Sequence, residues 1–344
     1  MVSPKRILHI CNLNLFRQGQ SYYSTDWKIR NGLIRNGHHV YDFCYRDVAR
    51  WENPFRTTRL GITKMNNRLL QTIDQYNPEL ILFGHCELVR PENITQIRKT
   101  YPDIRMAQWY VDSLVFDNKR QQLADRSQYM DMVFTTTGGE LLESLKTDRN
   151  RVAFFPNMAD ASIESCRNHE KSDLPLDFLF CGRDYNSERT ERIKRIVASL
   201  PELKSEVWGC LGNPPLTGHA FYGKLSQAAS SLNLSHVEDV PFCTSGRMTQ
   251  LLGNGLLTFT PETPGMRTLF SPEEVIYYEK DEDLIEKINY FAANKEMLQE
   301  VAARGWKRVH TSYSVERVTR FMVEAIFDEP FSEKYEWETE CYCG

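Results

Sequence analysis

Lys5-Arg-Ile-Leu-His-Ile-Cys11 is an almost unbroken apolar run of strand length. Such a run is typical of a parallel strand that is buried on both faces of its sheet. A helical pattern follows over Thr25 to Arg35 and stops at Asn36-Gly37, and His39 to Cys44 is the next strand. Strands separated by helix-length segments predict a parallel sheet with right-handed crossovers.

The same alternation fills the first half of the chain and then starts again. Residues 157–175 are polar and lack sustained periodicity, so they mark a domain boundary. The second pattern opens with Asp177-Phe-Leu-Phe-Cys-Gly182, and a helix is expected over Tyr222 to Leu232. The expected α/β architecture is two doubly wound, Rossmann-like domains that face a central cleft. Their expected bounds are residues 1–157 and residues 158–330, whose last helices can cross back to the first domain, with residues 331–344 as a tail.

Composition narrows the class of protein. The 344 residues have a formal net charge of −4, with 41% hydrophobic and 26% charged residues. No apolar run reaches the ~18–20 residues of a membrane span, and the start of the chain lacks a signal-peptide core. The nine cysteines show no Cys-x-x-Cys pair, which argues against a disulfide framework or a zinc motif. Without a Lys/Arg block, nucleic acid is not an expected partner. We expect a cytoplasmic protein, and leave open its oligomeric state and a peripheral membrane association.

Several common catalytic motifs are missing. No expected strand is followed by Gly-x-Gly-x-x-Gly or by a Walker phosphate loop, which disfavours a dehydrogenase and a P-loop nucleotidase. No Gly-x-Ser-x-Gly elbow is present, which disfavours an α/β-hydrolase.

Three loops in the second half have the composition of an anion site. Gly182-Arg183 follows a strand, and the next helix opens at Ser187 and carries Arg189 and Arg192. Small residues let the backbone approach an anion, and guanidinium groups and helix N-termini supply positive potential. The second loop is Ser245-Gly246-Arg247, and the third is Thr263-Pro264-Gly265-Met266. Because ligands of parallel sheets bind at the carboxyl ends of strands, these loops predict a site for a nucleotide diphosphate.

The order of motifs in the last third resembles a known family. Ser245-Gly-Arg247, Gln250, Gly255-Leu-Leu-Thr-Phe259, Pro264-Gly265, Glu274-Val-Ile-Tyr-Tyr278 and His310-Thr311 with Arg317 follow one another. This arrangement resembles the donor domain of GT-B glycosyltransferases, in particular the spore-maturation-protein-like branch related to glycosyltransferase family four. Phe155-Pro-Asn-Met-Ala-Asp160 and Trp109-Tyr-Val-Asp112 are similar to other parts of these enzymes.

The resemblance implies sugar transfer from a nucleotide-diphosphate sugar, with a UDP-sugar as the expected donor, to a glycan, lipid-linked or protein acceptor. Such transfer serves surface polysaccharide or glycoconjugate synthesis, and neither a metal nor a cofactor is expected. The implied acceptor residues are Asn14 and Gly19. The implied donor-binding residues are Gly182, Arg183, Arg189, Ser245, Gly246, Arg247, Gln250, Pro264, Gly265 and Met266.

This sequence departs from the family pattern at the Glu-x(7)-Glu pair. Gln250 occupies the second position of that pair and Phe242 stands eight residues earlier. In an inverting reaction Asp112 is the leading candidate for the general base, with His85 second. The resemblance favours retention, in which case both residues orient sugars. Asp281-Glu-Asp283 is interpreted as the start of a helix and not as a metal site.

Two alternative functions remain at this point. A sugar-nucleotide epimerase on the same fold would consume its donor without an acceptor. A degenerate protein, favoured by the missing Glu pair, would bind the sugar nucleotide without turnover.

Overall fold

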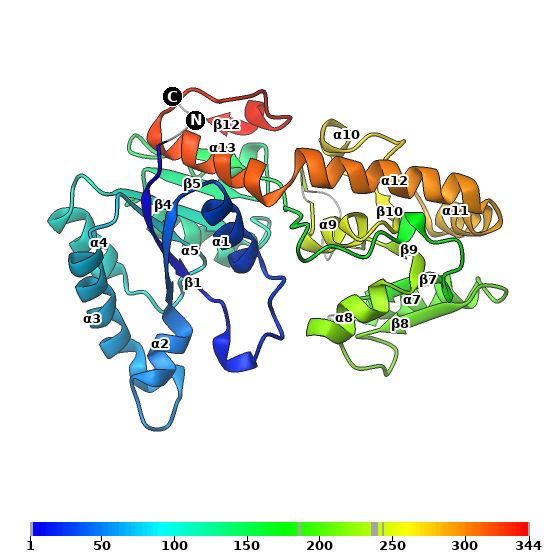
Figure 1. Ribbon diagram of the computed structural model, residues 1–344, viewed down its shortest axis with the longest axis horizontal. Helices are drawn as coiled ribbons and strands as arrows, with labels where there is room; N and C mark the ends of the chain where they lie inside the picture. The colour runs from blue at the N-terminus through cyan, green and yellow to red at the C-terminus, as the bar shows by residue number, and fades with distance from the viewer. Residues whose placement is uncertain (1–2, 185–186, 235–239, 243, 343–344) are drawn as a thin grey trace. The chain divides into compact units, whose positions relative to one another are not determined.

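The computed structural model describes residues 3–184, 187–234, 240–242 and 244–342 (Figure 1). The chain divides into two compact units. The first unit comprises Met1–Pro156, Val240–Cys243 and Val315–Gly344, and the second comprises Asn157–Asp239 and Thr244–Ser314. Each unit is a parallel sheet covered by helices, as the alternation of strands and helices predicts.

The first unit contains a seven-stranded sheet in the order β12-β6-β5-β4-β3-β1-β2. All neighbouring strands pair in parallel except β12 and β6, which are antiparallel. The strands are β1 (Arg6–Cys11), β2 (His39–Cys44), β3 (Leu80–Phe83), β4 (Arg105–Tyr110), β5 (Met132–Thr135), β6 (Arg151–Phe154) and β12 (Cys341–Tyr342). The helices are α1 (Thr25–Arg35), α2 (Tyr45–Trp51), α3 (Thr58–Tyr76), α4 (Pro91–Thr100), α5 (Asp117–Ser127), α6 (Glu140–Glu143) and α13 (Val315–Phe327).

The direction of winding reverses at β1 in this sheet. From β1 the chain moves to β2 on one side, whereas β3, β4, β5 and β6 follow on the other side. With right-handed crossovers, α1 therefore covers one face and α3, α4 and α5 cover the opposite face. Helix α13 packs against α1, as Figure 1 shows, and a Cβ on Gly32 of α1 would lie 2.3 Å from the Val315 carbonyl oxygen.

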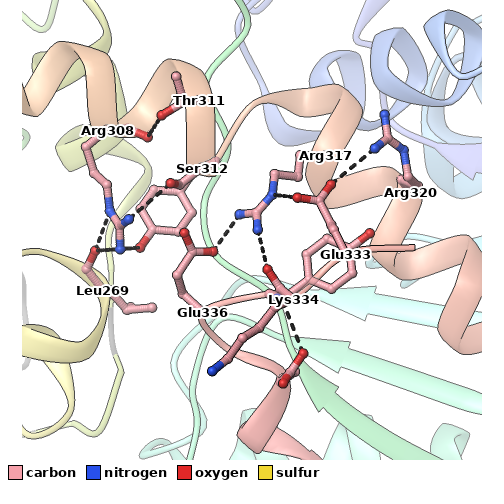
Figure 2. A network of polar contacts seen from close by, with 12 residues as sticks. Leu269, Arg308, Thr311, Ser312, Arg317, Arg320, Glu333, Lys334 and Glu336 are labelled. Carbon is pink, nitrogen blue, oxygen red and sulfur yellow. Dashed lines mark hydrogen bonds and ion pairs between the residues drawn. The ribbon is translucent and has the colours of Figure 1, made fainter. Parts of the chain in front are cut away.

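Residues 331–344 were expected as a tail, but the described part of this segment, residues 331–342, packs in the first unit. Trp337 is fully buried, and Cys341–Tyr342 forms the edge strand β12. On α13, Arg317 donates to the carboxylates of Glu333 and Glu336, at 2.7 and 2.5 Å (Figure 2). The segment lacks a helical or strand period because it is held by ion pairs and aromatic contacts with α13. Such contacts need acidic and aromatic residues, but they need no regular spacing between them.

The second unit contains a five-stranded parallel sheet in the order β11-β10-β9-β7-β8. Its core includes buried side chains of β7, α7, α11 and α12. The strands are β7 (Leu176–Cys181), β8 (Ser205–Trp208), β9 (Ala228–Leu232), β10 (Leu257–Pro261) and β11 (Ile276–Tyr278). The helices are α7 (Ser187–Ala198), α8 (Gly218–Leu225), α9 (Gly246–Gly253), α10 (Met266–Leu269), α11 (Asp281–Ala293) and α12 (Lys295–Ser312).

The helix expected over Tyr222 to Leu232 is wrong in its second half. Helix α8 ends at Leu225, and Ala228-Ala-Ser-Ser-Leu232 is the central strand β9. This strand lacks β-branched residues, so its sequence carries no strand signal. Its serines are stabilised by the sheet, because Ser230 and Ser231 donate to the carbonyl oxygens of Asp177 and Leu179 on β7.

Within the described ranges, no helix is both long enough and apolar enough to cross a membrane.

Candidate functional site

The carboxyl edge of the second sheet has a topological switch between β7 and β9. These strands pair directly, but β7 leads to β8 on one side and β9 leads to β10 on the other. Loops that leave a sheet in opposite directions open a crevice beyond the strand ends, and ligands of such folds bind there. Gly182-Arg183 follows β7 and Asn233-Leu234 follows β9, so these two segments flank the crevice.

Two arginines converge on this edge. Arg189 of α7 and Arg247 of α9 both donate to the carbonyl oxygen of Leu234, at 2.9 and 2.7 Å. Their guanidinium carbons lie 5.5 and 5.6 Å from the ring centroid of Phe180. Two guanidinium groups on one carbonyl oxygen bring positive charge to the end of β9, and guanidinium groups are common ligands of anions.

Close approach of the backbone requires glycine beside these arginines. A Cβ on Gly182 would lie 2.9 Å from Nη2 of Arg189 and 2.8 Å from the Phe180 ring. Gly209, which follows β8, has φ +87°, and its Cβ would lie 2.5 Å from the Gly182 carbonyl oxygen. A side chain at Gly182 or Gly209 would therefore clash with the turn after β7, which requires glycine at both positions.

A chain of polar side chains joins the strand ends to α9. Asn233 donates to Oγ1 of Thr260 on β10 at 3.1 Å, and Ser245 donates to Oδ1 of Asn233 at 2.6 Å. Oγ of Ser245 also accepts from the backbone N–H of Met248, which caps α9. The predicted helix start at Ser245-Gly246-Arg247 is thus fixed to the end of β9. Gly246 is exposed and Gln250 is half-buried on the same helix.

The loop after β10 supplies a buried hydroxyl. Thr263 is 8% exposed, and its Oγ1 has no hydrogen-bond partner in the described part of the chain. Gly265 adopts φ +79°, a left-handed conformation that favours glycine. Pro264 is exposed, whereas the Met266 side chain is buried in the core and its backbone N–H donates to the Thr263 carbonyl oxygen at 3.1 Å.

Two further arginines belong to the first of the three predicted anion loops. Arg183 is exposed and forms no hydrogen bond or ion pair with any residue that the structure describes. Nε of Arg192 lies 2.7 Å from Asp281 at the start of α11. Asp283 accepts from Lys287 at 2.8 Å and from the Glu279 backbone N–H at 3.1 Å. Asp281 therefore faces an arginine, and Asp283 faces a lysine and a backbone donor, at a helix start.

In the first unit, the ends of β3 and β4 bring His85 and Asp112 together. His85 Nδ1 lies 4.0 Å from Oδ2 of Asp112. The same oxygen lies 3.1 Å from Nζ of Lys119 and accepts from the Tyr110 hydroxyl at 3.3 Å. Burial, together with the nearby Asp112 charge, raises the pKa of the Tyr110 phenol, so it remains a donor at neutral pH. Several donors thus converge on one carboxylate oxygen.

A pocket of about 800 Å³ opens beside this cluster, between α4 and α5. Gln108 of β4 is 1% exposed and donates to the Gly84 carbonyl oxygen at 3.1 Å, while its Oε1 lacks a partner among the described residues. A buried acceptor without a partner costs about 1–3 kcal/mol, so a ligand hydroxyl that donated to it would be favoured. The polar lining includes His85, Glu87, Gln108, Tyr110, Lys119 and Arg126.

The two predicted acceptor residues belong to the loop after β1. Asn14 and Gly19 flank the single turn Leu15–Arg17, with φ of +59° and +84°. Asn14 is half-buried and Gly19 is exposed. The structure thus groups Gly182, Arg189, Ser245 and Arg247 at one edge, and groups His85 with Asp112 at another.

The sequence analysis missed Asn233, Leu234 and Gln108. Asn233 and Leu234 were missed because β9 was interpreted as a helix. An Asn after a short run of small residues is a weak signal for a strand end. The unpartnered Oε1 of Gln108 depends on tertiary packing and has no signal in the sequence.

Solved structures of low sequence identity share this fold. Sucrose-phosphate synthase from Thermosynechococcus elongatus superposes with a TM-score of 0.66 at 12% identity, covering 94% of this chain and 98% of its own. A glycosyltransferase from Rickettsia africae superposes with a TM-score of 0.62 at 11% identity. The match covers 95% of this chain and 99% of that one. Anabaena HepE in complex with UDP-glucose superposes with a TM-score of 0.59 at 10% identity. The match covers 94% of this chain and 100% of that one. The predicted GT-B fold is confirmed.

The match to a known sequence family covers only part of the chain. Residues 189–324 match the family model described as glycosyl transferase-like, and this range includes both arginines that share the Leu234 carbonyl oxygen. The chain matches no curated protein sequence. A glycosyl transferase-like segment therefore coincides with most of the second unit.

Proposed function

We propose that the protein is a glycosyltransferase that moves a sugar from a nucleotide-diphosphate donor, with UDP as the first choice of nucleotide, to a glycan, lipid-linked or protein acceptor. The observation that carries the proposal is the pair Arg189 and Arg247 on one carbonyl oxygen at the switch point of the second unit. The glycosyl transferase-like match over residues 189–324 supports it. The spore-maturation-protein-like branch, a cytoplasmic location and a role in surface polysaccharide or glycoconjugate synthesis are part of the same proposal.

The chemistry requires stabilisation of the leaving diphosphate. Negative charge develops on that group as the glycosidic bond to the donor breaks, and preorganised guanidinium groups can stabilise it without a metal. Arg247 and Arg189 supply the charge, the N-terminus of α9 adds backbone N–H groups, and Gly182 permits close approach. The buried hydroxyl of Thr263 is a further candidate contact to the donor.

A thermal-shift series with nucleoside mono- and diphosphates tests the donor site. A diphosphate at about 100 times its Kd should stabilise the protein by about 2.7 kcal/mol, because only the folded state binds it. We expect UDP to raise the Tm more than UMP at equal concentration, since the second phosphate meets the arginine pair. No shift with any nucleoside diphosphate would contradict the proposed donor site.

The acceptor is proposed to bind at the pocket of the first unit beside His85 and Asp112. The free Oε1 of Gln108 and the half-buried Arg126 suit the hydroxyl and acidic groups of a sugar. Lys119 and the Tyr110 hydroxyl already occupy Oδ2 of Asp112. We therefore assign Asp112 the role of orienting the acceptor in a transfer that retains the anomeric configuration.

Asp112→Asn tests this assignment. An orienting carboxylate should raise KM for the acceptor several-fold and change kcat little, whereas loss of a general base should lower kcat by about 10²–10⁴-fold. We expect the first result, together with an NMR spectrum of the product that shows retained configuration. Asp103→Asn, in the exposed turn before β4 and outside the lining of this pocket, is the matched control. A fall in kcat in the larger range with unchanged KM would identify Asp112 as the base of an inverting enzyme.

The two alternative functions give different products. An epimerase would consume the UDP-sugar in the absence of any acceptor, and a degenerate binding protein would show the UDP-dependent thermal shift with no turnover. A putative UDP-N-acetylglucosamine 2-epimerase from Listeria monocytogenes shares the fold with a TM-score of 0.52. Incubation of the protein with donor alone and then with donor plus acceptor separates the three functions.

A further inference from the structure

Four side chains of metal-ligating type meet on one face of the β1–β2 ladder. His9 is in register with Asp42, and Cys11 is in register with Cys44 two positions further along. Residues two apart on a strand share a face, so these two rungs present an imidazole, a carboxylate and two thiols to the same space. Nucleotide binding and the proposed acceptor pocket do not use this cluster.

The distances among His9, Cys11 and Asp42 approach those of a tetrahedral zinc site. His9 Nδ1 and Asp42 Oδ1 are 3.1 Å apart, Cys11 Sγ and Asp42 Oδ1 are 3.9 Å apart, and the two Sγ atoms are 4.0 Å apart. Bond lengths of ~2.0–2.3 Å to zinc imply ligand separations of roughly 3.3–3.8 Å in a tetrahedron. His9, Cys11 and Asp42 each offer a ligand atom within 4.8 Å of the others. Cys44 lies outside this group of three and is 4.0 Å from Cys11 Sγ, so its side chain would have to turn toward the other ligands to supply a fourth position.

The side chains of the cluster are deeply buried, and one ring nitrogen of His9 lacks a partner in the described ranges. His9 and Cys11 are fully buried, and Cys44 is 6% exposed. Nε2 of His9 has no hydrogen-bond partner among the residues that the structure describes. A buried imidazole that satisfies one nitrogen through a carboxylate and leaves the other without a partner loses hydrogen bonding on folding. Coordination through Nε2 would recover that loss, whereas coordination through Nδ1 would replace the hydrogen bond to Asp42.

The charges around the cluster are compatible with a divalent cation. Nε of Arg30 on α1 lies 2.5 Å from Oδ2 of Asp42, which leaves Oδ1 directed at His9 and Cys11. Two thiolates and one carboxylate would carry three negative charges, and Zn²⁺ with Arg30 would balance them. Ligating carboxylates in metal sites are commonly held by a second hydrogen bond of this kind.

We propose that His9, Cys11, Asp42 and Cys44 bind one zinc ion, which joins β1 to the edge strand β2. Mixed nitrogen, sulfur and oxygen ligation in a closed four-ligand site is typical of structural zinc. Binding replaces the two thiol protons with bonds from sulfur to the metal, and both protons leave to solvent. Because the ligands come from two strands, the sequence has no Cys-x-x-Cys motif that would indicate the site.

Metal titration of the reduced full-length protein tests the proposal. After treatment with a chelator, the protein should bind one Zn²⁺ per chain in competition with a chromophoric chelator, and Co²⁺ should give the absorption of a tetrahedral thiolate complex. Cys44→Ser should lower the Zn²⁺ affinity at least about 100-fold. Arg30→Gln, which removes only the second hydrogen bond to Asp42, should lower it about 10-fold. Cys166→Ser in the second unit, a half-buried thiol outside the cluster, should change nothing.

Three results would overturn the proposal. One is the absence of stoichiometric Zn²⁺ binding by the wild-type protein, which is decisive whatever the variants do. The second is an equal loss of affinity in Cys166→Ser. The third is a Cys11–Cys44 disulfide, found by mass spectrometry in protein prepared without reductant, together with no metal uptake after reduction. Because UDP binding is measured separately by thermal shift, failure of the zinc site leaves the glycosyltransferase proposal untouched, and the reverse also holds.

Discussion

Arg247→Ala is expected to weaken UDP binding by roughly 10–150-fold, since a hydrogen bond to a charged group contributes about 1.5–3 kcal/mol. The effect on kcat/KM should be larger, about 10²–10³-fold, because negative charge on the diphosphate grows in the transition state. The physical basis is the position of Arg247 beside Arg189, on the same carbonyl oxygen and over the same ring. Calorimetric titration with UDP and initial-rate kinetics measure the two effects.

Two variants make this prediction specific. Arg247→Lys keeps the positive charge but loses the forked geometry of the guanidinium. Its UDP affinity should therefore lie between those of the wild type and the alanine variant. Arg195→Ala removes an exposed arginine of α7 that lies 3.7 Å from Asp281, and it should bind UDP like the wild type. An Arg247→Ala protein that folds normally and keeps the UDP affinity of the wild type would contradict the proposed role of the arginine pair.

Trp337→Ala should destabilise the first unit by about 3–5 kcal/mol, the usual effect of truncating a fully buried aromatic residue. Trp337 is 0% exposed, and its ring packs against Phe321 with centroids 5.5 Å apart. The guanidinium of Arg317 lies 5.4 Å from the centroid of the same ring. Urea unfolding followed by circular dichroism measures the change in free energy.

Trp51 offers a matched control in the same unit. Its side chain is 56% exposed at the end of α2, so Trp51→Ala should cost about 1 kcal/mol or less. If both tryptophan variants unfolded at the same urea concentration, residues 331–344 would not contribute to the core of the first unit in solution.

The strands of both units could be predicted where they are continuous apolar runs. Arg6–Cys11 and Leu176–Cys181 are of this type, and both are centred on buried aliphatic and aromatic residues. β9 could not be predicted, because alanine and serine are stabilised there by neighbours on both sides of the strand and not by their own propensity. The polar helix α5 gave no signal either, since only Leu123 and Ser127 are buried on it.

The sequence was sufficient to predict which loops form the candidate site, but not which residues contact one another there. Gly182, Ser245 and Arg247 follow from the rule that ligands bind beyond strand ends. Their hydrogen-bond partners could not be predicted, because Asn233 and Leu234 lie at the end of β9, which has no strand signal in the sequence. The zinc cluster was missed for a related reason. Its ligands lie on two strands, and only their register brings them together.

The packing of α13 and β12 in the first unit has a consequence for biosynthesis. Residues 315–344 leave the ribosome after the whole of the second unit, yet they cover α1 and pair with β6. Domains generally fold as they are made, starting from the N-terminus. Here the nascent first unit has an unpaired edge on β6 throughout translation of the second, which is a surface prone to aggregation. Chaperone occupancy on the translating chain should therefore persist until the last segment emerges.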